Sequence, residues 1–416
     1  MSFLYLEGSK RNFIIRFFVA VVVIPVFVSA MAMGCVLAPQ GPSLEEEPEP
    51  GRLVLVEEDH WPDFTDDLDA ESFITAIDRS LLYYDRLPGD RTFHYGDIEY
   101  TLQEMKESLF LLRDIFEDNP FPGEIREKMK GKFDLYRAIG RNGDGDVLFT
   151  GYFEPVIRGS LERTDRYRYP IYRTPDDHTV IRLDLFNDKY EGERIVARIE
   201  NGEVIPYYSR KEIDIEGRLE GRGLEIAWTD DPVDLFFMHI QGSGTIVLKN
   251  GETIRVSYAA SNGRPYRSLG RYLAEIGVVA LADVSLKGIK QYLHSADEMM
   301  SILAHNESYV FFRVVEEGPL GALNIPVTAG RTIATDPALF PKGAPAFISL
   351  KQPNFSAEGN VISWAPFSRF VLNQDTGGAI KGPGRVDLFM GTGEEAGLIA
   401  GYMKEYGRLY FLAKKR

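Results

Sequence analysis

The sequence predicts a mainly β fold with helical additions. Between Tyr167 and Tyr258, short apolar runs alternate with turn residues, which is the pattern of strands in all-β domains. From Ala322 to the C-terminus, glycine and proline turns again separate short strands. Apolar residues at helical spacing are confined to a few stretches, so helices are expected as additions to a β framework.

The first 34 residues have the layout of an export signal. Lys10, Arg11 and Arg16 precede an apolar run from Phe17 to Gly34, and Cys35 follows directly. A cysteine in this place resembles the processing site of bacterial lipoproteins, where the thiol takes lipid and becomes the new N-terminus. An uncleaved membrane anchor and simple secretion are the alternatives. All three place the rest of the chain outside the cytoplasm.

Residues 35–52 are predicted to be a tether. Prolines and glutamates dominate this stretch, and that composition favours an extended, solvated chain. Ordered structure should begin near Leu53. We therefore expect 1–34 to be a lipoprotein signal peptide and 35–52 to hold a domain off a membrane surface.

Two helices are expected after the tether. Residues 69–88 carry apolar side chains at helical spacing. A second helix should begin at Thr101, because Glu104 three residues later completes a capping-box pattern. It should end near Asn119, which precedes a proline.

Strands and further helices follow in order. The expected strands are Phe133–Ile139, Val147–Phe153, Tyr169–Tyr172, Leu235–Ile240, Thr245–Leu248, Thr253–Tyr258 and Arg408–Leu412. The turn at 141–146 is expected to form a hairpin. It is not a calcium loop, because Val147 and Phe153 stand where that loop needs glycine and glutamate. Helical spacing returns at 267–305 and again at 394–406.

Composition excludes several classes of function. The 416 residues carry a net charge of −15, which argues against nucleic acid as a partner, because phosphate binding needs a concentrated basic face. The single cysteine excludes an internal disulfide and a cysteine-based zinc site. The six histidines lack zinc-binding spacing. The run Gln241–Gly244 lacks the Gly-x-Ser-x-Gly elbow of serine hydrolases.

Carboxylates remain as the groups that can carry chemistry. Asp336, Asp375 and Asp387 lie in three separate β-like settings near the C-terminus. Apolar neighbours flank Asp387, so burial could raise its pKa and keep it protonated as a general acid. Asp375 could approach it on a neighbouring strand, whereas Asp336, next to a proline, fits a turn cap.

Six motifs in order resemble the membrane-bound lytic murein transglycosylase A family. They are Phe149-Thr150-Gly151-Tyr152-Phe153-Glu154-Pro155, His239-Ile240-Gln241-Gly242-Ser243-Gly244, Ser261-Asn262-Gly263-Arg264-Pro265-Tyr266-Arg267-Ser268-Leu269-Gly270, Asp375-Thr376-Gly377-Gly378-Ala379-Ile380-Lys381-Gly382, Val386-Asp387-Leu388-Phe389 and Gly391-Thr392-Gly393. The resemblance covers roughly residues 70–414. Its last part is similar to the C-terminal region called 3D after three aspartates.

The resemblance implies a two-domain architecture. A double-psi β-barrel, the catalytic 3D domain, would be formed by residues 53–155 and 319–416. A smaller inserted β domain would span 156–318. A groove between the two domains would bind a glycan strand of peptidoglycan.

The resemblance also implies a reaction. A lytic transglycosylase cleaves the β-1,4 bond between N-acetylmuramic acid and N-acetylglucosamine and forms a 1,6-anhydro product. Asp387 would be the single acid and base, and Asp375 would orient or tune it. Expected glycan contacts are Thr150, Gly151, Tyr152, Gln241, Ser243, Asn262, Tyr266, Arg331 and Lys381. No metal or organic cofactor is required.

Two alternatives remain open at this level. A peptidoglycan hydrolase would use Asp387 as acid and either Asp375 or Glu154 as base. A non-catalytic lipoprotein would bind the cell wall without cleaving it. The expected partners are peptidoglycan strands, an outer membrane reached through the lipid anchor and proteins of wall synthesis. We expect a monomer on the periplasmic side of that membrane.

Lipidation of Cys35 can be tested directly. Changing Cys35→Ala removes the thiol that takes the lipid, so the variant should accumulate as an unprocessed or soluble form. Metabolic labelling with fatty acid measures this. Equal label in wild type and variant would contradict the lipoprotein assignment.

Overall fold

The computed structural model describes residues 53–118, 123–278 and 286–416. The predicted signal peptide, Cys35 and the tether therefore lie outside the described residues. Within the described ranges, every helix is too short or too polar to cross a membrane. The first described element is a strand that begins at Leu53.

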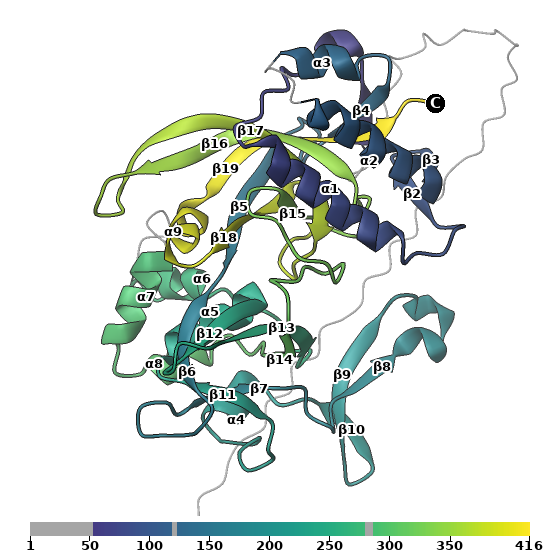
Figure 1. Ribbon diagram of the computed structural model, residues 1–416. Helices are drawn as coiled ribbons and strands as arrows, with labels where there is room; N and C mark the ends of the chain where they lie inside the picture. The colour runs from purple at the N-terminus through teal and green to yellow at the C-terminus, as the bar shows by residue number, and fades with distance from the viewer. Residues whose placement is uncertain (1–52, 119–122, 279–285) are drawn as a thin grey trace, which may run out of the picture. The chain divides into compact units, whose positions relative to one another are not determined.

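A closed β-barrel is the centre of the structure (Figure 1). In ring order, its strands are β19 (Lys404–Lys414), β16 (Pro345–Phe355), β17 (Val361–Asp375), β15 (Thr332–Ala334), β18 (Arg385–Thr392) and β5 (Val147–Glu154). The ring closes because β5 pairs with both β18 and β19. Phe347, Phe370 and Phe411 are completely buried in its core. The prediction of a mainly β fold is confirmed.

Two more strands extend this sheet past β19. They are β1 (Leu53–Val56) and β4 (Phe133–Ala138). β19 is 11 residues long, so it pairs with β5 through its first residues and with β4 through its last. The turn at 141–146 thus joins two described strands that pair with β19 and not with each other. The hairpin prediction is wrong for this reason.

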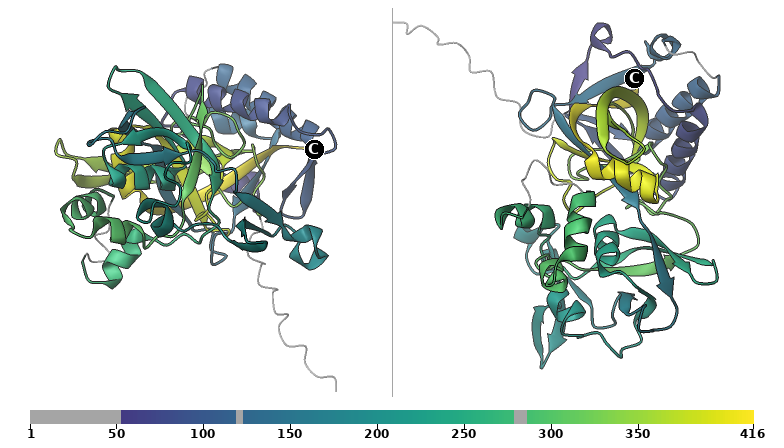
Figure 2. Two further views of the ribbon diagram at one scale, coloured as in Figure 1. Left: turned by 90° about the horizontal axis from the view of Figure 1, so that it is seen from below. Right: turned by 90° about the vertical axis from the view of Figure 1, so that its left-hand side faces the viewer.

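Helices α1 (Ala70–Tyr84) and α2 (Leu102–Glu117) pack side by side against the barrel (Figures 1 and 2). The predicted capping box is confirmed, because Thr101 and Glu104 each accept the other's backbone N–H. Apolar residues of both helices join the barrel core. A two-stranded sheet, β2 (Thr92–Tyr95) and β3 (Ile98–Thr101), lies between them in sequence, and α3 (Glu124–Met129) follows.

A second sheet has six strands. In order, they are β14 (Val310–Val315), β13 (Thr253–Ser261), β12 (Ser243–Leu248), β6 (Val156–Ser160), β11 (Glu225–Thr229) and β7 (Tyr169–Tyr172). A third sheet contains β10 (Glu203–Pro206), β9 (Arg194–Glu200) and β8 (Thr179–Arg182). The barrel strand β5 leads through Pro155 directly into β6, so one continuous segment serves both larger sheets.

One predicted strand is a helix. The stretch Leu235–Ile240 belongs to α5 (Pro232–Gln241). Asp231 caps this helix by accepting the backbone N–H of Val233 at 2.8 Å, and Gly242 ends it in the left-handed conformation. A short run that is apolar except for His239 has no periodicity that distinguishes a buried helix from a buried strand. Here the N-terminal cap Asp231 and the terminating Gly242 favour the helix.

The other helices agree more closely with expectation. Helices α6 (Leu269–Glu275), α7 (Leu286–Ser295) and α8 (Met299–Leu303) lie within the predicted helical region, and α4 (Arg210–Asp214) precedes them. Short 3-10 turns occupy Glu58–His60, Leu183–Leu185 and Asp188–Tyr190. Helix α9 (Glu394–Tyr402) ends earlier than predicted, because β19 begins at Lys404 to reach β5.

A buried ion pair ties the start of α1 to the barrel. Arg331 is completely buried, and its Nη1 lies 2.6 Å from Asp66 Oδ2. The same guanidinium donates to Ser72 Oγ and to the carbonyl oxygens of Asp69 and Phe370. The side chain therefore has partners on both the helix and the barrel.

Removing this guanidinium should be costly. Arg331→Gln leaves the Asp66 carboxylate buried without its cation, which typically lowers the free energy of unfolding by about 3–5 kcal/mol. Urea denaturation measures the loss. The control is Lys106→Gln, whose pairing with the largely exposed Asp85 is worth no more than about 1 kcal/mol. Equal, small losses in both variants would contradict a structural role for Arg331.

Candidate active site

Asp387 lies on β18 between two core residues. Val386 and Leu388 are completely buried, and strand alternation turns Asp387 to the opposite face, where part of its surface stays accessible. Burial raises the pKa of Asp387 to about 7, opposed by a hydrogen bond from Thr150 and by the charge of Arg385. The negative charge of Asp375 raises this pKa further. The carboxyl can therefore give up and regain a proton near neutral pH.

Thr150 is the side chain that orients Asp387. β5 and β18 run parallel with these two residues in register. The Thr150 hydroxyl donates to Asp387 Oδ1 at 2.8 Å, and its oxygen accepts from Arg385 Nη2 at 3.4 Å. One carboxyl oxygen of Asp387 is thus fixed by the neighbouring strand.

Asp375 ends β17 and is held by three donors. The Tyr152 hydroxyl donates to Oδ2 at 2.7 Å, and the backbone N–H groups of Ala322 and Thr376 donate to Oδ1, each at 2.8 Å. Burial raises the pKa of Asp375, while these three hydrogen bonds lower it. Donors on both oxygens stabilise the carboxylate form and fix its position, so this group is well placed to act through its charge.

The strand register sets the spacing of the acidic groups. Ala334 of β15 pairs with Asp387 on one side and with Asp375 on the other, so the two aspartates lie two strand spacings apart, about 10 Å between Cα atoms. Glu154 lies four residues beyond Thr150 on β5, about 13 Å along the strand. It is buried and bonded to Thr392 and Thr245, away from Asp387.

Tyr152 completes this cluster. Its ring lies 5.1 Å from that of Phe389 on the neighbouring strand, and its hydroxyl reaches Asp375. Burial, followed by the charges of Asp375 and Asp387, raises the pKa of Tyr152 well above its usual value. The structure therefore brings Thr150, Tyr152, Asp375 and Asp387 together.

Three predicted residues lie at or near β5 in supporting positions. A Cβ atom on Gly151 would lie 2.8 Å from the Cα of Ala400, so this glycine allows α9 to pack closely on the strand. Gln241 Oε1 accepts the backbone N–H of Phe153 at 3.0 Å, which connects the end of α5 to β5. Ser243 begins β12 and is buried.

The remaining predicted residues are not part of the cluster. Asn262 is buried, and its side chain bonds to four backbone groups of neighbouring loops. Arg331 is the completely buried side chain that pairs with Asp66, so it is not accessible to a glycan. Tyr266 is 47% exposed. Lys381 is mostly exposed, and its Nζ lies 3.7 Å from Asp336 Oδ1.

Asp336 acts as a turn cap, as the sequence indicates. Its Oδ1 accepts the backbone N–H of Ala338, and its Oδ2 accepts that of Gly382 at 2.8 Å. The second bond holds the loop between Asp375 and Asp387 against the barrel. Asp336 therefore acts on the cluster only through this loop.

Sequence reasoning missed Arg385 and Ala322. Arg385 lies two residues before Asp387 on the same strand, so strand alternation was a usable signal for it. Ala322 contributes only a backbone N–H, which no side-chain motif reveals. In the described ranges, His, Cys, Asp and Glu side chains do not gather in any group of three or more that could hold a metal ion.

The burial of Asp387 predicts a pH-dependent stability. Its pKa of about 7 in the folded state exceeds the ordinary value of 3.8, so folding favours the protonated form. The stability that protonated Asp387 contributes to the folded state is fully present below about pH 3.8 and is lost as the pH rises through 7. The Asp387→Asn variant stays neutral at every pH, so it does not lose this stability. Compared with wild type, its free energy of unfolding should therefore be higher at pH 8 by roughly 2–4 kcal/mol, measured relative to the same comparison at pH 4.

Urea unfolding of both proteins at several pH values measures this effect. Thr150→Val, which removes the hydroxyl that lowers the pKa of Asp387, should move the wild-type transition to higher pH. A stability difference between wild type and Asp387→Asn that does not change with pH would contradict a buried, protonated Asp387.

Two family models match the chain. Residues 148–313 match the MltA specific insert domain, and residues 331–413 match the 3D domain. The membrane-bound lytic murein transglycosylase A of Escherichia coli K12 is 32% identical over 296 residues, which are 70% of this chain and 72% of that protein. The Vibrio cholerae protein of the same name is 32% identical over 279 residues, 66% of this chain and 67% of that protein.

Solved structures show the same likeness. The membrane-bound lytic murein transglycosylase from Agrobacterium tumefaciens has a TM-score of 0.71 and 31% identity, covering 87% of this chain and 98% of that one. Escherichia coli MltA with bound chitohexaose has a TM-score of 0.69 and 25% identity, covering 89% of this chain and 98% of that one. The chain therefore belongs to the membrane-bound lytic murein transglycosylase A family.

Proposed function

We propose that this protein is a lytic transglycosylase of peptidoglycan, with Asp387 as its single acid and base. The observation that carries the proposal is a partly accessible carboxyl with a pKa of about 7, fixed at one oxygen by Thr150. Such a group is a proton donor and, once ionised, a proton acceptor at the same pH. A bound oligosaccharide, chitohexaose, in the Escherichia coli relative supports a glycan as the substrate class.

The proposed reaction needs one carboxyl group. Protonated Asp387 gives its proton to the oxygen that links N-acetylmuramic acid to N-acetylglucosamine, and the C1–O bond breaks. The muramic C6 hydroxyl attacks C1, and its proton returns to the Asp387 carboxylate. The product is a 1,6-anhydro sugar, water is not consumed, and the acid is regenerated. The fixed negative charge of Asp375 would stabilise the positive charge that develops at C1.

The hydrolase alternative fits these positions less well. A glycosidase needs a second carboxylate about 5–5.5 Å from the acid if it retains configuration, or about 6.5–9.5 Å if it inverts. Glu154 is too far along β5 and is engaged by two threonines. Asp375 accepts three hydrogen bonds, which make it a weak base for activating water.

The finer architecture is part of the same proposal. We infer a double-psi barrel from residues 53–155 and 319–416, an inserted domain from 156–318, and a glycan-binding groove between them. Thr150, Tyr152 and Gln241 would contact the glycan. A lipid on Cys35 would hold the enzyme on the periplasmic side of the outer membrane, and the word "membrane-bound" in the relatives' name supports such an association. We expect a monomer.

The decisive experiment is product analysis of Asp387→Asn. The variant keeps the size of the side chain but removes the transferable proton, so the rate should fall by about 10³–10⁴-fold while the fold survives. Mass spectrometry of fragments released from purified peptidoglycan measures both rate and product. Asp375→Asn should cost less, because that group does not transfer the proton.

Two controls make the result interpretable. Circular dichroism confirms that each variant is folded, and Lys106→Gln, remote from the site, should retain the wild-type rate. Muramic acid with a free reducing end in place of the anhydro sugar would refute the transglycosylase reaction. A folded Asp387→Asn variant with a near wild-type rate would show that another residue is the acid.

A further inference from the structure

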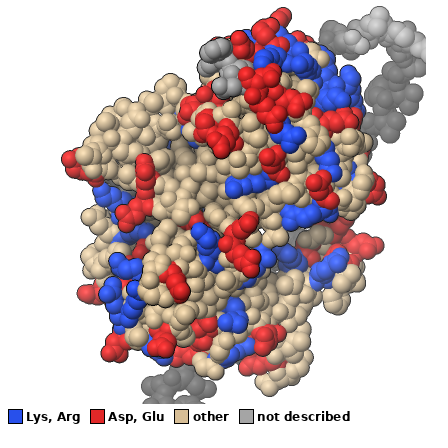
Figure 3. All heavy atoms as spheres, viewed as in Figure 1, with Lys and Arg blue, Asp and Glu red and all other residues tan. Residues whose placement is uncertain are grey.

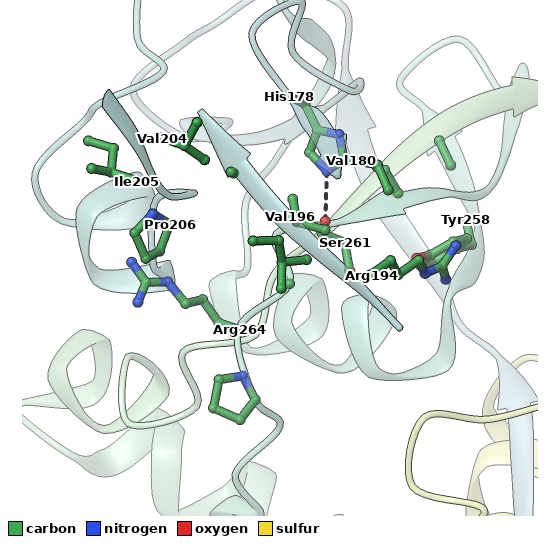
Figure 4. Close-up of a pocket in the computed structure, with 16 residues that line it drawn as sticks. His178, Val180, Arg194, Val196, Val204, Ile205, Pro206, Tyr258, Ser261 and Arg264 are labelled. Atoms are coloured by element: carbon green, nitrogen blue, oxygen red, sulfur yellow. Dashed lines mark hydrogen bonds between the residues drawn. The ribbon is translucent and has the colours of Figure 1, made fainter. Parts of the chain in front are cut away.

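A cavity lies away from Asp387, between the third sheet and the end of β13 (Figure 4). Its volume is 680 Å³, within the range of sites that enclose small ligands. Strands β8, β9 and β10 form one wall, and residues 258–265 form the other. None of the four residues of the acid cluster lines it.

The lining of this cavity contains basic but no acidic side chains. Arg194, Arg264 and His178 are among its 16 residues, and no aspartate or glutamate is. This contrasts with the whole chain, whose net charge is −15, and with the face in Figure 3, where acidic and basic side chains are interspersed. A cavity without carboxylates in an acidic protein is suited to an anionic ligand.

Its second wall is built rigidly. His178 Nε2 hydrogen-bonds to the carbonyl oxygen of Ser261 at 2.8 Å, and this bond crosses the cavity from one wall to the other (Figure 4). Gly263 has a φ of 71°, and a Cβ atom there would lie 2.6 Å from Cβ of Val196, so the loop passes close against β9. Arg264 Nε donates to the carbonyl oxygen of Tyr207 at 2.9 Å. The Arg264 side chain is therefore held in place before any ligand arrives.

The two guanidinium groups still have capacity to bind. The nearest carboxylate to Arg264 is that of Glu212, 4.0 Å from Nη2, the outer limit of an ion pair. Arg194 is exposed, and the part of the chain that the structure describes offers it no carboxylate within ion-pair distance. In Figure 4, Arg264 and Arg194 lie on opposite sides of the cavity with Val196 between them, and Val204 also lines it. A matching ligand has separated negative groups joined by a partly apolar stretch.

We propose that this cavity binds the peptide stem attached to the peptidoglycan strand, with Arg194 and Arg264 taking its carboxylates. This inference rests on the proposed function, because it takes peptidoglycan as the substrate. The stem joins several carboxylates through short alkyl side chains, which matches the two arginines and the valines that line the cavity. The sugars of the glycan backbone are uncharged, so they do not need two arginines as binding partners in this arrangement.

Calorimetric titration of the full chain tests the proposal. The probe is the free stem tetrapeptide L-Ala–D-Glu–meso-diaminopimelate–D-Ala, and the matched probe is the same peptide with its carboxylates amidated. Hydrogen bonds to charged groups are worth about 1.5–3 kcal/mol, so Arg194→Gln should weaken binding of the acidic peptide about tenfold or more. Arg218→Gln, an exposed arginine of the same region outside the cavity, should leave binding unchanged.

The outcomes separate this inference from the proposed function. Equal affinity of wild type and Arg194→Gln, or of the acidic and amidated peptides, overturns the cavity assignment whatever the turnover assays show. Tighter binding of the acidic peptide that depends on Arg194 supports it, and binding is measured without turnover. In turnover, Arg194→Gln should raise KM for peptide-bearing strands more than for peptide-free strands, whereas the failure of Asp387 as acid would appear in the product analysis alone.

Discussion

The hydrogen bonds of β5 to β18 and β19 close the barrel, and the rest of the active cluster depends on them. Pairing with β18 sets Thr150 opposite Asp387, and pairing with β19 completes the ring. The same strand carries Tyr152 toward Asp375 and then continues into the six-stranded sheet through β6. Because side chains alternate along a strand, a slip of one residue would turn both hydroxyl groups away from the carboxylates.

The chemistry follows from a balance between burial and hydrogen bonding. Both Asp375 and Asp387 are partly buried, and burial raises the pKa of each. Three donors oppose this effect at Asp375, whereas Asp387 has one side-chain hydrogen bond, from Thr150, and the charge of Arg385. Two similar groups thus suit the two proposed roles, Asp375 as a fixed charge and Asp387 as a proton carrier. Both Asp387 neighbours come from β5 or β18, so the strands themselves tune the acid.

The structure brings together Thr150, Tyr152, Asp375 and Asp387, as expected, whereas some predicted elements of the fold are wrong. Asp387 between apolar residues and the Thr101 capping box are local patterns, and local patterns survive folding. The helix at 232–241 and the pairing of β4 with β19 were missed, because an apolar run has no period and strand partners are chosen by distant residues. Arg331 was misread for the same reason: its partner Asp66 lies 265 positions away, and nothing near it in sequence marks it as buried.

The distance in sequence between Thr150 and Asp387 has a consequence for how the protein matures. The hydrogen bond between them spans 237 positions, so it cannot form until nearly the whole chain has been made. Contacts of such long range are slow to form, since the intervening chain must be ordered before the ends gain by meeting. A chain that ends before β18 lacks Asp387, and one that lacks β19 cannot close the ring. Incomplete chains therefore lack the cluster of Thr150, Tyr152, Asp375 and Asp387, which is assembled only in the finished fold.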